Sequence, residues 1–354
     1  MLHDRKGMAL VLTLLAVSFM VAVTVQLGSS VNWQMQAAAT QSDIVQLDAM
    51  LLSGLHLAQA ALLADQRENQ YDSAFDRWGT FDVEVLAALF PGGKLDVQVT
   101  DLSGLLQINA LVLTTEEKKQ QEQQNKKNKN GTGQQQDEEK QQRELWQRFL
   151  KNTAGLEKEE DILSLLDSLV DWIDEDDEER ENGAEKTYYS SQSPPYAPAN
   201  RPVLLPEELF LIKGWDKLLR RESEDDDTEE AAKKAAAIIQ YLSAAGEEGT
   251  INLNTAPVQV LQALHEQMTE ELATKLVEFR QAEENKDKLE ELDWYKQIPG
   301  FPGDIVFDNE LVTVSSSWFK VTVDAEFKGL QRTGIGVIHR MDNQEQELLW
   351  WKAE

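Results

Sequence analysis

The chain begins with a short charged leader, residues 1–7, followed by a long stretch without charge. Residues 8–25 read MALVLTLLAVSFMVAVTV, and after Lys6 no charged side chain appears until Asp43. An α-helix rises 1.5 Å per residue, so these eighteen residues span about 27 Å, close to the hydrocarbon thickness of a bilayer. We therefore expect residues 8–28 to form a transmembrane helix and the rest of the chain to be tethered to a membrane.

The leader presents two basic residues and a glycine directly before the apolar helix: Arg5, Lys6 and Gly7. This order resembles the type IV prepilin leader, which a peptidase cuts on the cytoplasmic side after the glycine. It implies cleavage between Gly7 and Met8. Basic residues stay in the cytoplasm, so the residues beyond the helix should lie across the membrane. A secretory signal peptide and an uncleaved anchor are the alternatives, although residues 26–30 offer only a weak small-x-small site.

The apolar pattern continues past the bilayer. Apolar side chains recur at spacings mostly of three and four: Trp33, Met35, Ile44, Leu47, Leu51, Leu55, Leu62 and Leu63. This period is typical of one helical face, so we expect a single long helix, half in lipid and half under a globular domain. Leu12 stands at the fifth position after the cleavage site, where most pilins and pseudopilins carry Glu.

Composition narrows the class of function. The 354 residues carry a formal net charge of -29 and no cysteine. Polyanions would be repelled, so nucleic acid is not an expected partner. Domains in an oxidising compartment are commonly stabilised by disulfides. Because this chain has none, a bound metal is the more plausible way to stabilise its loops. The four His are scattered, and neither a phosphate-binding glycine loop nor a nucleophile elbow is present, so we do not expect an enzyme.

Several segments after the long helix have clear local patterns. Leu95–Thr100 alternates as a strand after a predicted turn at Phe90–Lys94. Residues 116–144 contain no apolar side chain, which predicts a disordered insertion with helical flanks at most. The C-terminal segment alternates like two or three strands, with a turn near Lys328-Gly329 and an end near Trp350.

Six consecutive acids, residues 174–179, follow a predicted buried helix, and Gly183 lies just beyond them. Negative charge at a helix C-terminus opposes the helix dipole, which suggests that a cation lies among them. Oxygen ligands on a glycine-containing loop favour Ca²⁺. The predicted ligands are Asp174, Asp176, Asp177 and Glu185. The loop is no EF-hand, because Glu179 stands where that motif needs Gly; a plain acidic surface loop is the alternative.

Residues 252–280 resemble a helix-hairpin-helix unit, in which two apolar helical faces are joined by a short turn. Many such units bind DNA phosphates through a glycine-rich hairpin flanked by basic residues. This one lacks that hairpin and belongs to a strongly acidic chain. DNA binding is therefore disfavoured.

Landmarks along the chain together resemble the general secretion pathway protein K family, the minor pseudopilin K of type II secretion. They are RKG-MALVL at the start, INAL at 108–111, DWIDEDDEERENGAEKTYY, PPYAPANRP, EELFLIKGW, INLNTAPVQVL and the terminal SWFKVTV. The combination is specific, although each piece alone is weak. The chain departs from the pattern in two polar insertions, at 116–144 and 219–245.

The resemblance implies an α+β fold: a long N-terminal helix and a pilin-like α+β domain that carries a large inserted α-helical domain. The boundaries that follow are 1–7 for the leader, 8–28 for the membrane span, 29–110 and 300–354 for the pilin-like domain, and 111–299 for the insert. The inserted domain would bind Ca²⁺.

The resemblance also implies a function. Such a protein caps the tip of the pseudopilus and initiates its assembly with minor pseudopilins I and J, for export of folded proteins across the outer membrane. Prepilin peptidase would process it, and it would sit in the bacterial inner membrane as a single-pass protein with its C-terminal domain in the periplasm. The alternatives are a DNA-uptake pilin component and a free-standing, membrane-anchored calcium-binding protein.

Overall fold

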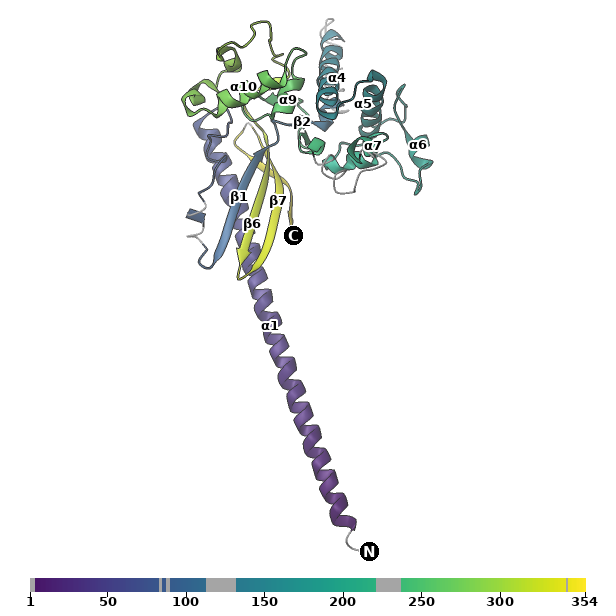
Figure 1. Cartoon of the computed structure of the whole chain (residues 1–354), viewed down its shortest axis with the longest axis vertical. Helices are drawn as coiled ribbons and strands as arrows, with labels where there is room; N and C mark the ends of the chain where they lie inside the picture. Colours follow the sequence, from purple (N-terminus) through teal and green to yellow (C-terminus); the bar gives the residue numbers. More distant parts are fainter. Residues whose placement is uncertain (1–3, 83–84, 87–89, 113–131, 221–236, 342) are drawn as a thin grey trace.

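The computed structural model describes residues 4–82, 85–86, 90–112, 132–220, 237–341 and 343–354. A long helical stem projects from a head in which an antiparallel sheet lies against the upper part of the helix, and a group of short helices lies beyond the sheet (Figure 1). The fold is thus α+β with a long N-terminal helix, an antiparallel sheet and an inserted helical region, as the sequence predicted.

The stem is helix α1, Asp4–Glu68, a continuous helix of 65 residues. Its described side chains are exposed from Met8 to Ser42 and become buried from Leu47 onward. The exposed part includes the most apolar 18-residue window, with a mean hydropathy of 2.6, so α1 is long and apolar enough to cross a membrane. One helix therefore has an exposed half and a half that packs under the head, which confirms the expectation of a single long helix; its position in lipid stays a prediction.

The C-terminal half of α1 packs on one face of the sheet. Its buried side chains are Leu47, Met50, Leu51, Leu55, Ala58 and Leu62. Their spacing of mostly three and four places them along one side of the helix. Gly54 lies on this side, and a Cβ there would be 2.5 Å from a Val323 methyl group. The missing side chain therefore lets the helix approach the sheet closely.

The sheet has the order β1-β6-β7-β8, and all its pairs are antiparallel. The strands are β1 (Gly93–Asp101), β6 (Trp318–Phe327), β7 (Leu330–Arg340) and β8 (Gln346–Ala353). Strand β1 comes from the N-terminal part of the chain and pairs along β6, with Leu95 opposite Ala325 and Val97 opposite Val323. The two ends of the chain thus form one sheet, and the helical region lies between them in sequence.

The observed strands extend the predicted ones by a few residues. Strand β1 begins at Gly93, inside the predicted turn, and β8 continues three residues beyond Trp350. The turn between β6 and β7 lies at Lys328 and Gly329, where the sequence predicted it, and both residues have positive φ (50° and 83°). Two consecutive positive φ values are the geometry of a two-residue hairpin turn, which favours Gly at one position.

The inserted region consists mainly of helices, and it also contains two pairs of short parallel strands. Its helices are η1 (Ile108–Leu111), α4 (Thr132–Ala154), α5 (Glu159–Ile173), α6 (Lys186–Ser190), η2 (Pro206–Leu211), α7 (Trp215–Arg220), α9 (Val258–Ala263), α10 (Glu270–Gln281), η3 (Glu283–Lys288) and η4 (Trp294–Gln297). Its strand pairs are β2 (Leu106–Gln107) with β3 (Leu242–Ser243), and β4 (Ile251–Asn252) with β5 (Val312–Thr313). Helices α9 and α10 are the two helices expected within 252–280.

Two apolar clusters divide the head. One lies between α1 and the sheet; the other fills the helical region and runs in sequence from Leu106 to Val312. Trp146, Phe149 and Trp215 are fully buried in the second cluster and meet edge to face. The division at 110/111 and 299/300 stays a prediction, and the second cluster extends beyond it on both sides, from Leu106 to Val312.

The sequence predicted a disordered insertion at 116–144 with helical flanks at most. From Thr132 the chain is helical, as the first half of α4, while residues 113–131 lie outside the described part. Polar contacts hold this part of α4 in place. Gln142 donates to the Gly249 carbonyl at 2.8 Å, and Arg143 pairs with Asp167 at 2.8 Å. Most of the second insertion, 219–245, also lies outside the described residues.

Candidate functional site

The acidic run begins where helix α5 ends. Ile173 is the last helical residue, and Asp174 is the C-cap, with its amide bonded to the Val170 carbonyl. The chain then turns back and reaches the short helix α6, which starts after Glu185. Asp174 is 6% exposed and Glu185 is 3% exposed, so two of the four predicted ligands are buried.

Asp171, which the sequence analysis did not select, lies at the bottom of this loop and is fully buried. Its Oδ2 accepts hydrogen bonds from the amides of Ala184 and Arg180, at 2.8 and 3.2 Å. A Cβ at Gly183 would clash with this same oxygen, so glycine is needed for the loop to pass so close. Asp171 thus shapes the loop through its backbone.

Glu185 is the most unusual carboxylate of the group. Neither of its oxygens accepts a hydrogen bond of ordinary geometry from the described part of the chain. Burial, and then the charges of Asp171 and Asp174, raise its pKa from 4.5 to about 7. A buried carboxylate without donors is costly, and a cation would relieve both the burial and the repulsion.

The other two predicted ligands are exposed. Asp176 uses Oδ1 to accept from the Glu178 amide at 2.9 Å, in a local turn. Asp177 is also exposed and adds only a small charge effect to the raised pKa of Glu185. The structure therefore buries Asp174 and Glu185 beside Asp171, and leaves Asp176 and Asp177 at the surface.

Arg180 lies beside the buried acids. Its Nε is 3.5 Å from Asp171 Oδ1, and its Nη2 is 3.5 Å from Asp174 Oδ2. Its side chain is 37% exposed, and both contacts are long for a charge-assisted hydrogen bond. One guanidinium faces several carboxylates here, so the loop keeps an excess of negative charge and oxygen atoms, which suits a hard cation.

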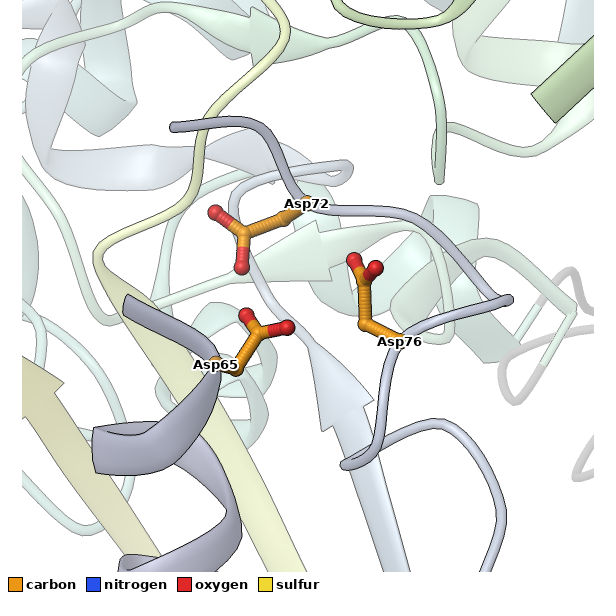
Figure 2. Close-up of side chains that lie close together, drawn as sticks. All are labelled: Asp65, Asp72 and Asp76. Atoms are coloured by element: carbon orange, nitrogen blue, oxygen red, sulfur yellow. The ribbon is translucent and has the colours of Figure 1, made fainter. Parts of the chain in front are cut away.

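A second acidic group lies where α1 meets the sheet and the helical region. It consists of Asp65 in the last turn of α1, and Asp72 and Asp76 in the following loop (Figure 2). All three are buried, at 2%, 1% and 4% exposure. One oxygen from each lies within 4.8 Å of the others, which is close enough for a shared cation. Arg340, at the end of β7, pairs with Asp65 and Asp72.

Beside this group, Asp101 at the end of β1 accepts from several donors. Ser316 Oγ, Thr255 Oγ1 and Asn252 Nδ2 donate to Oδ2, and the Ser103 amide donates to Oδ1. Burial raises the pKa of Asp101 to about 6 even though these bonds lower it. Asn252 also donates to the Asp72 carbonyl. The buried polar groups therefore join the sheet to the helical region.

The residues that the sequence analysis missed share one feature. Asp65, Asp101 and Asp171 are single carboxylates next to apolar residues, in segments whose helical or strand pattern predicts only packing. One sequence signal could have identified them. In each case the apolar pattern places a charged residue on the buried side, or at the end, of a helix or strand. Their partners are up to 275 residues away in sequence, so the pattern alone does not reveal them.

Comparison with known proteins places these features in a family. Two family models, both described as type II secretion system (T2SS), protein K, match residues 104–224 and 251–314. They cover the acidic loop and the segment that contains Asn252, α9 and α10. Together they cover the helical region that distinguishes this head.

Curated relatives agree. The type II secretion system protein K of Pseudomonas aeruginosa is 28% identical over 271 residues, which cover 75% of this chain and 70% of that protein. A putative type II secretion system protein K of Escherichia coli K12 is 24% identical over 212 residues, 60% of this chain and 58% of that protein. The alignment with the Pseudomonas aeruginosa protein is long enough to extend beyond the helical region.

A solved structure has the same fold. A chain from a crystal structure of the GspK-GspI-GspJ complex of the enterotoxigenic Escherichia coli type 2 secretion system superposes with a TM-score of 0.60. The superposition covers 90% of this chain and 99% of that chain, at 18% sequence identity. The chain therefore belongs to the type II secretion system protein K family, whose members are structural pseudopilins and not enzymes.

Proposed function

We propose that this minor pseudopilin caps the tip of the type II secretion pseudopilus and, with minor pseudopilins I and J, initiates its assembly for export of folded proteins across the outer membrane. The observation that carries the proposal is the shape of the molecule: an exposed apolar stem with a large head at one end (Figure 1). A head that extends beyond the sheet as far as the helical region would obstruct a further subunit stacked above it.

Leu12 supports the tip position. In pilin-like filaments, the family resemblance implies, a Glu at this position meets the N-terminal amine of a neighbouring subunit inside an apolar helix bundle. That pairing offsets the desolvation of two charges. Leu12 is 62% exposed on the stem and offers no carboxylate. It therefore fits a subunit from which no such pairing is required.

The proposed partners are minor pseudopilins I and J. The structurally similar chain comes from a complex of GspK, GspI and GspJ, which supports this proposal. Co-expression of the tagged full-length chain with I and J from the same organism should yield a detergent-stable complex of all three. Leu12→Glu should leave its yield unchanged, because the contacts lie along helices and heads. Recovery of the tagged chain without I and J would contradict the proposal.

The proposed location is the inner membrane, with a single span and the head in the periplasm. Residues 8–25 carry exposed apolar side chains that lipid would cover, and the basic residues precede them. Prepilin peptidase would cut between Gly7 and Met8. Mass spectrometry of the protein extracted from membranes should find Met8 as the N-terminal residue. A native terminus at Met1, or beyond Ser29, would contradict the pilin-type anchor.

We further propose that the acidic loop binds Ca²⁺. Asp174 and Glu185 are the predicted ligands whose positions support this best, and Asp171 joins them from the last turns of α5. Asp177, like Asp176, is exposed. Asp176 lies at the rim and would contribute only through a movement of the exposed turn. Arg180 is partly exposed and would turn to solvent when the ion replaces it beside Asp171 and Asp174. The ion would then fix residues 174–189 against α5.

A further inference from the structure

The buried group of Asp65, Asp72 and Asp76 lies apart from the acidic loop, at the junction of stem, sheet and helical region. Figure 2 shows their carboxyl groups turned toward one another, one from the end of α1 and two from the next loop. Because all three lie within residues 65–76, the end of one helix and one loop supply them all. Such a local arrangement is typical of protein sites for hard cations.

The charges of the group do not balance. Arg340 is the cation that pairs with it among the described residues: Nη1 is 3.3 Å from Asp65 Oδ2, and Nη2 bonds to Asp72 Oδ2. Lys286 acts on Asp76 electrostatically but forms no ion pair with it within 4.0 Å. When all three carboxyl groups are ionised, one guanidinium leaves two negative charges in a buried place. A divalent cation would carry the matching charge.

Asp72 has an oxygen that is not used. Its Oδ2 accepts from Arg340 and from the Ser316 amide at 2.7 Å. Its Oδ1 is buried and accepts no hydrogen bond from the residues that the structure describes. An unsatisfied buried acceptor destabilises the fold, and more so if it is charged. The arrangement therefore leaves a ligand atom available on Asp72.

Asp76 is held in place without a cation. Its Oδ2 accepts from the Ser73 amide at 2.5 Å, and its Oδ1 accepts from Asn69 Nδ2 at 3.3 Å. These donors fix the direction of the carboxylate and leave further lone pairs on it. A carboxylate that is oriented by neutral donors and buried beside two others is a suitable cation ligand.

We propose that Asp65, Asp72 and Asp76 bind a divalent cation of the Ca²⁺ class, and that this ion fixes the joint between the stem and the helical region. Oxygen ligands alone favour Ca²⁺ or Mg²⁺ over transition metals. Mg²⁺ demands near-ideal octahedral geometry and retains several waters, whereas Ca²⁺ accepts irregular carboxylate sets. The buried and irregular triad therefore suits Ca²⁺.

The ion would act on the joint through Asp72. The Asp72 amide donates to the Val314 carbonyl at 2.8 Å, and its carbonyl accepts from Asn252 Nδ2 at 3.2 Å. Val314 and Asn252 belong to the helical region, whereas Asp65 belongs to the stem. Binding would thus tie the end of α1 to the region that forms the far end of the head.

Calcium binding by the full-length protein in detergent, after removal of metal by chelation, tests the proposal. The number of bound Ca²⁺ ions per chain would be measured by equilibrium dialysis for wild type, Asp76→Asn and Asp96→Asn. Asp96 is a half-buried carboxylate on β1 that accepts from Gln98 Nε2, so its variant removes the same charge outside the triad. We expect Asp76→Asn to lose one ion, or to bind it at least about tenfold more weakly, and Asp96→Asn to match wild type.

Further variants separate this site from the acidic loop. Glu185→Gln should lose a different ion, so the double variant with Asp76→Asn should lose both. Asp65→Asn is a second test if Asp76→Asn does not fold, as judged by circular dichroism in chelator. Unchanged Ca²⁺ number and affinity in a folded Asp76→Asn or Asp65→Asn protein would overturn the proposal. It would show that protons and Arg340 alone balance the triad. That result would leave the proposed role at the pseudopilus tip untouched.

Discussion

Replacing Arg340 with Met should destabilise the folded protein by about 3–5 kcal/mol, measured by chemical denaturation in detergent with chelator present. Arg340 is 6% exposed and pairs with two buried carboxylates. Removing one partner of a buried ion pair leaves an uncompensated buried charge, which is among the most costly of single changes. Met keeps much of the length and apolar volume of the Arg side chain. The loss of unfolding free energy therefore comes mainly from the missing charge and hydrogen bonds.

The same change at Arg332 is a matched control. Arg332 also lies on β7 and pairs with a carboxylate of α1, Asp48, but both side chains are partly exposed, at 26% and 46%. Exposed ion pairs contribute little, because water screens them. Arg332→Met should therefore cost no more than about 1 kcal/mol. Equal losses in the two variants would contradict the account of the joint.

The cost of Arg340→Met should grow with pH. Burial raises the pKa of Asp65 from 3.8 to about 7 in the folded protein, while Arg340 lowers it. A carboxyl with a raised folded pKa binds more protons when folded, so its contribution to stability falls as pH rises from about 4 to about 7. Without Arg340 that pKa rises further, so the fall is larger and extends to higher pH. The gap between variant and wild type should therefore be smaller at pH 5 than at pH 8.

Removing Ca²⁺ from the acidic loop should have the second large effect. A ligand that binds only the folded state stabilises it by about 2.7 kcal/mol at a hundredfold excess over its Kd. Chelation would also remove the ion proposed for the triad, so Glu185→Gln is the variant that isolates the loop. This variant should lose that part of the Ca²⁺-dependent rise in melting temperature, because Glu185 is a buried carboxylate with both oxygens available.

Glu179→Gln is the matched control for the loop. It removes one charge from the same acidic run, but at an exposed position. Its Ca²⁺-dependent rise in melting temperature should equal that of wild type. If Glu179→Gln and Glu185→Gln behave alike, the loop attracts cations only as a charged surface, and the alternative interpretation from the sequence is the correct one.

The parts of the fold that follow from periodicity were predictable. Charge-free residues 8–25 and the apolar spacing up to Leu62 specify α1, and alternation specifies β1 and the C-terminal hairpin. The turn at Lys328-Gly329 was found because glycine marks a backbone with positive φ. Each of these signals is local, so one sequence is enough to read it.

The joint between stem and helical region, and the part of Asp171 in the acidic loop, were not predictable in this way. Asp65 pairs with Arg340 across 275 residues, and Asp171 lies among buried apolar residues at the end of α5. The order of α4 before Glu144 depends on polar contacts to Gly249 and Asp167, which a count of apolar residues does not detect. In contrast, Asp174 and Glu185 could be selected from the sequence as candidate ligands, because crowded acids at a helix C-terminus conflict with the helix dipole. Their role as ligands stays a prediction.

The central claim, that this subunit caps the pseudopilus tip, is tested most directly by counting and locating its copies on sheared pili. Quantitative mass spectrometry would give the ratio of this protein to the major pseudopilin, and gold labelling of the head would give its position. We predict one copy per pilus, with label at one end. An abundance comparable to that of the major pseudopilin, or label along the shaft, would contradict the claim.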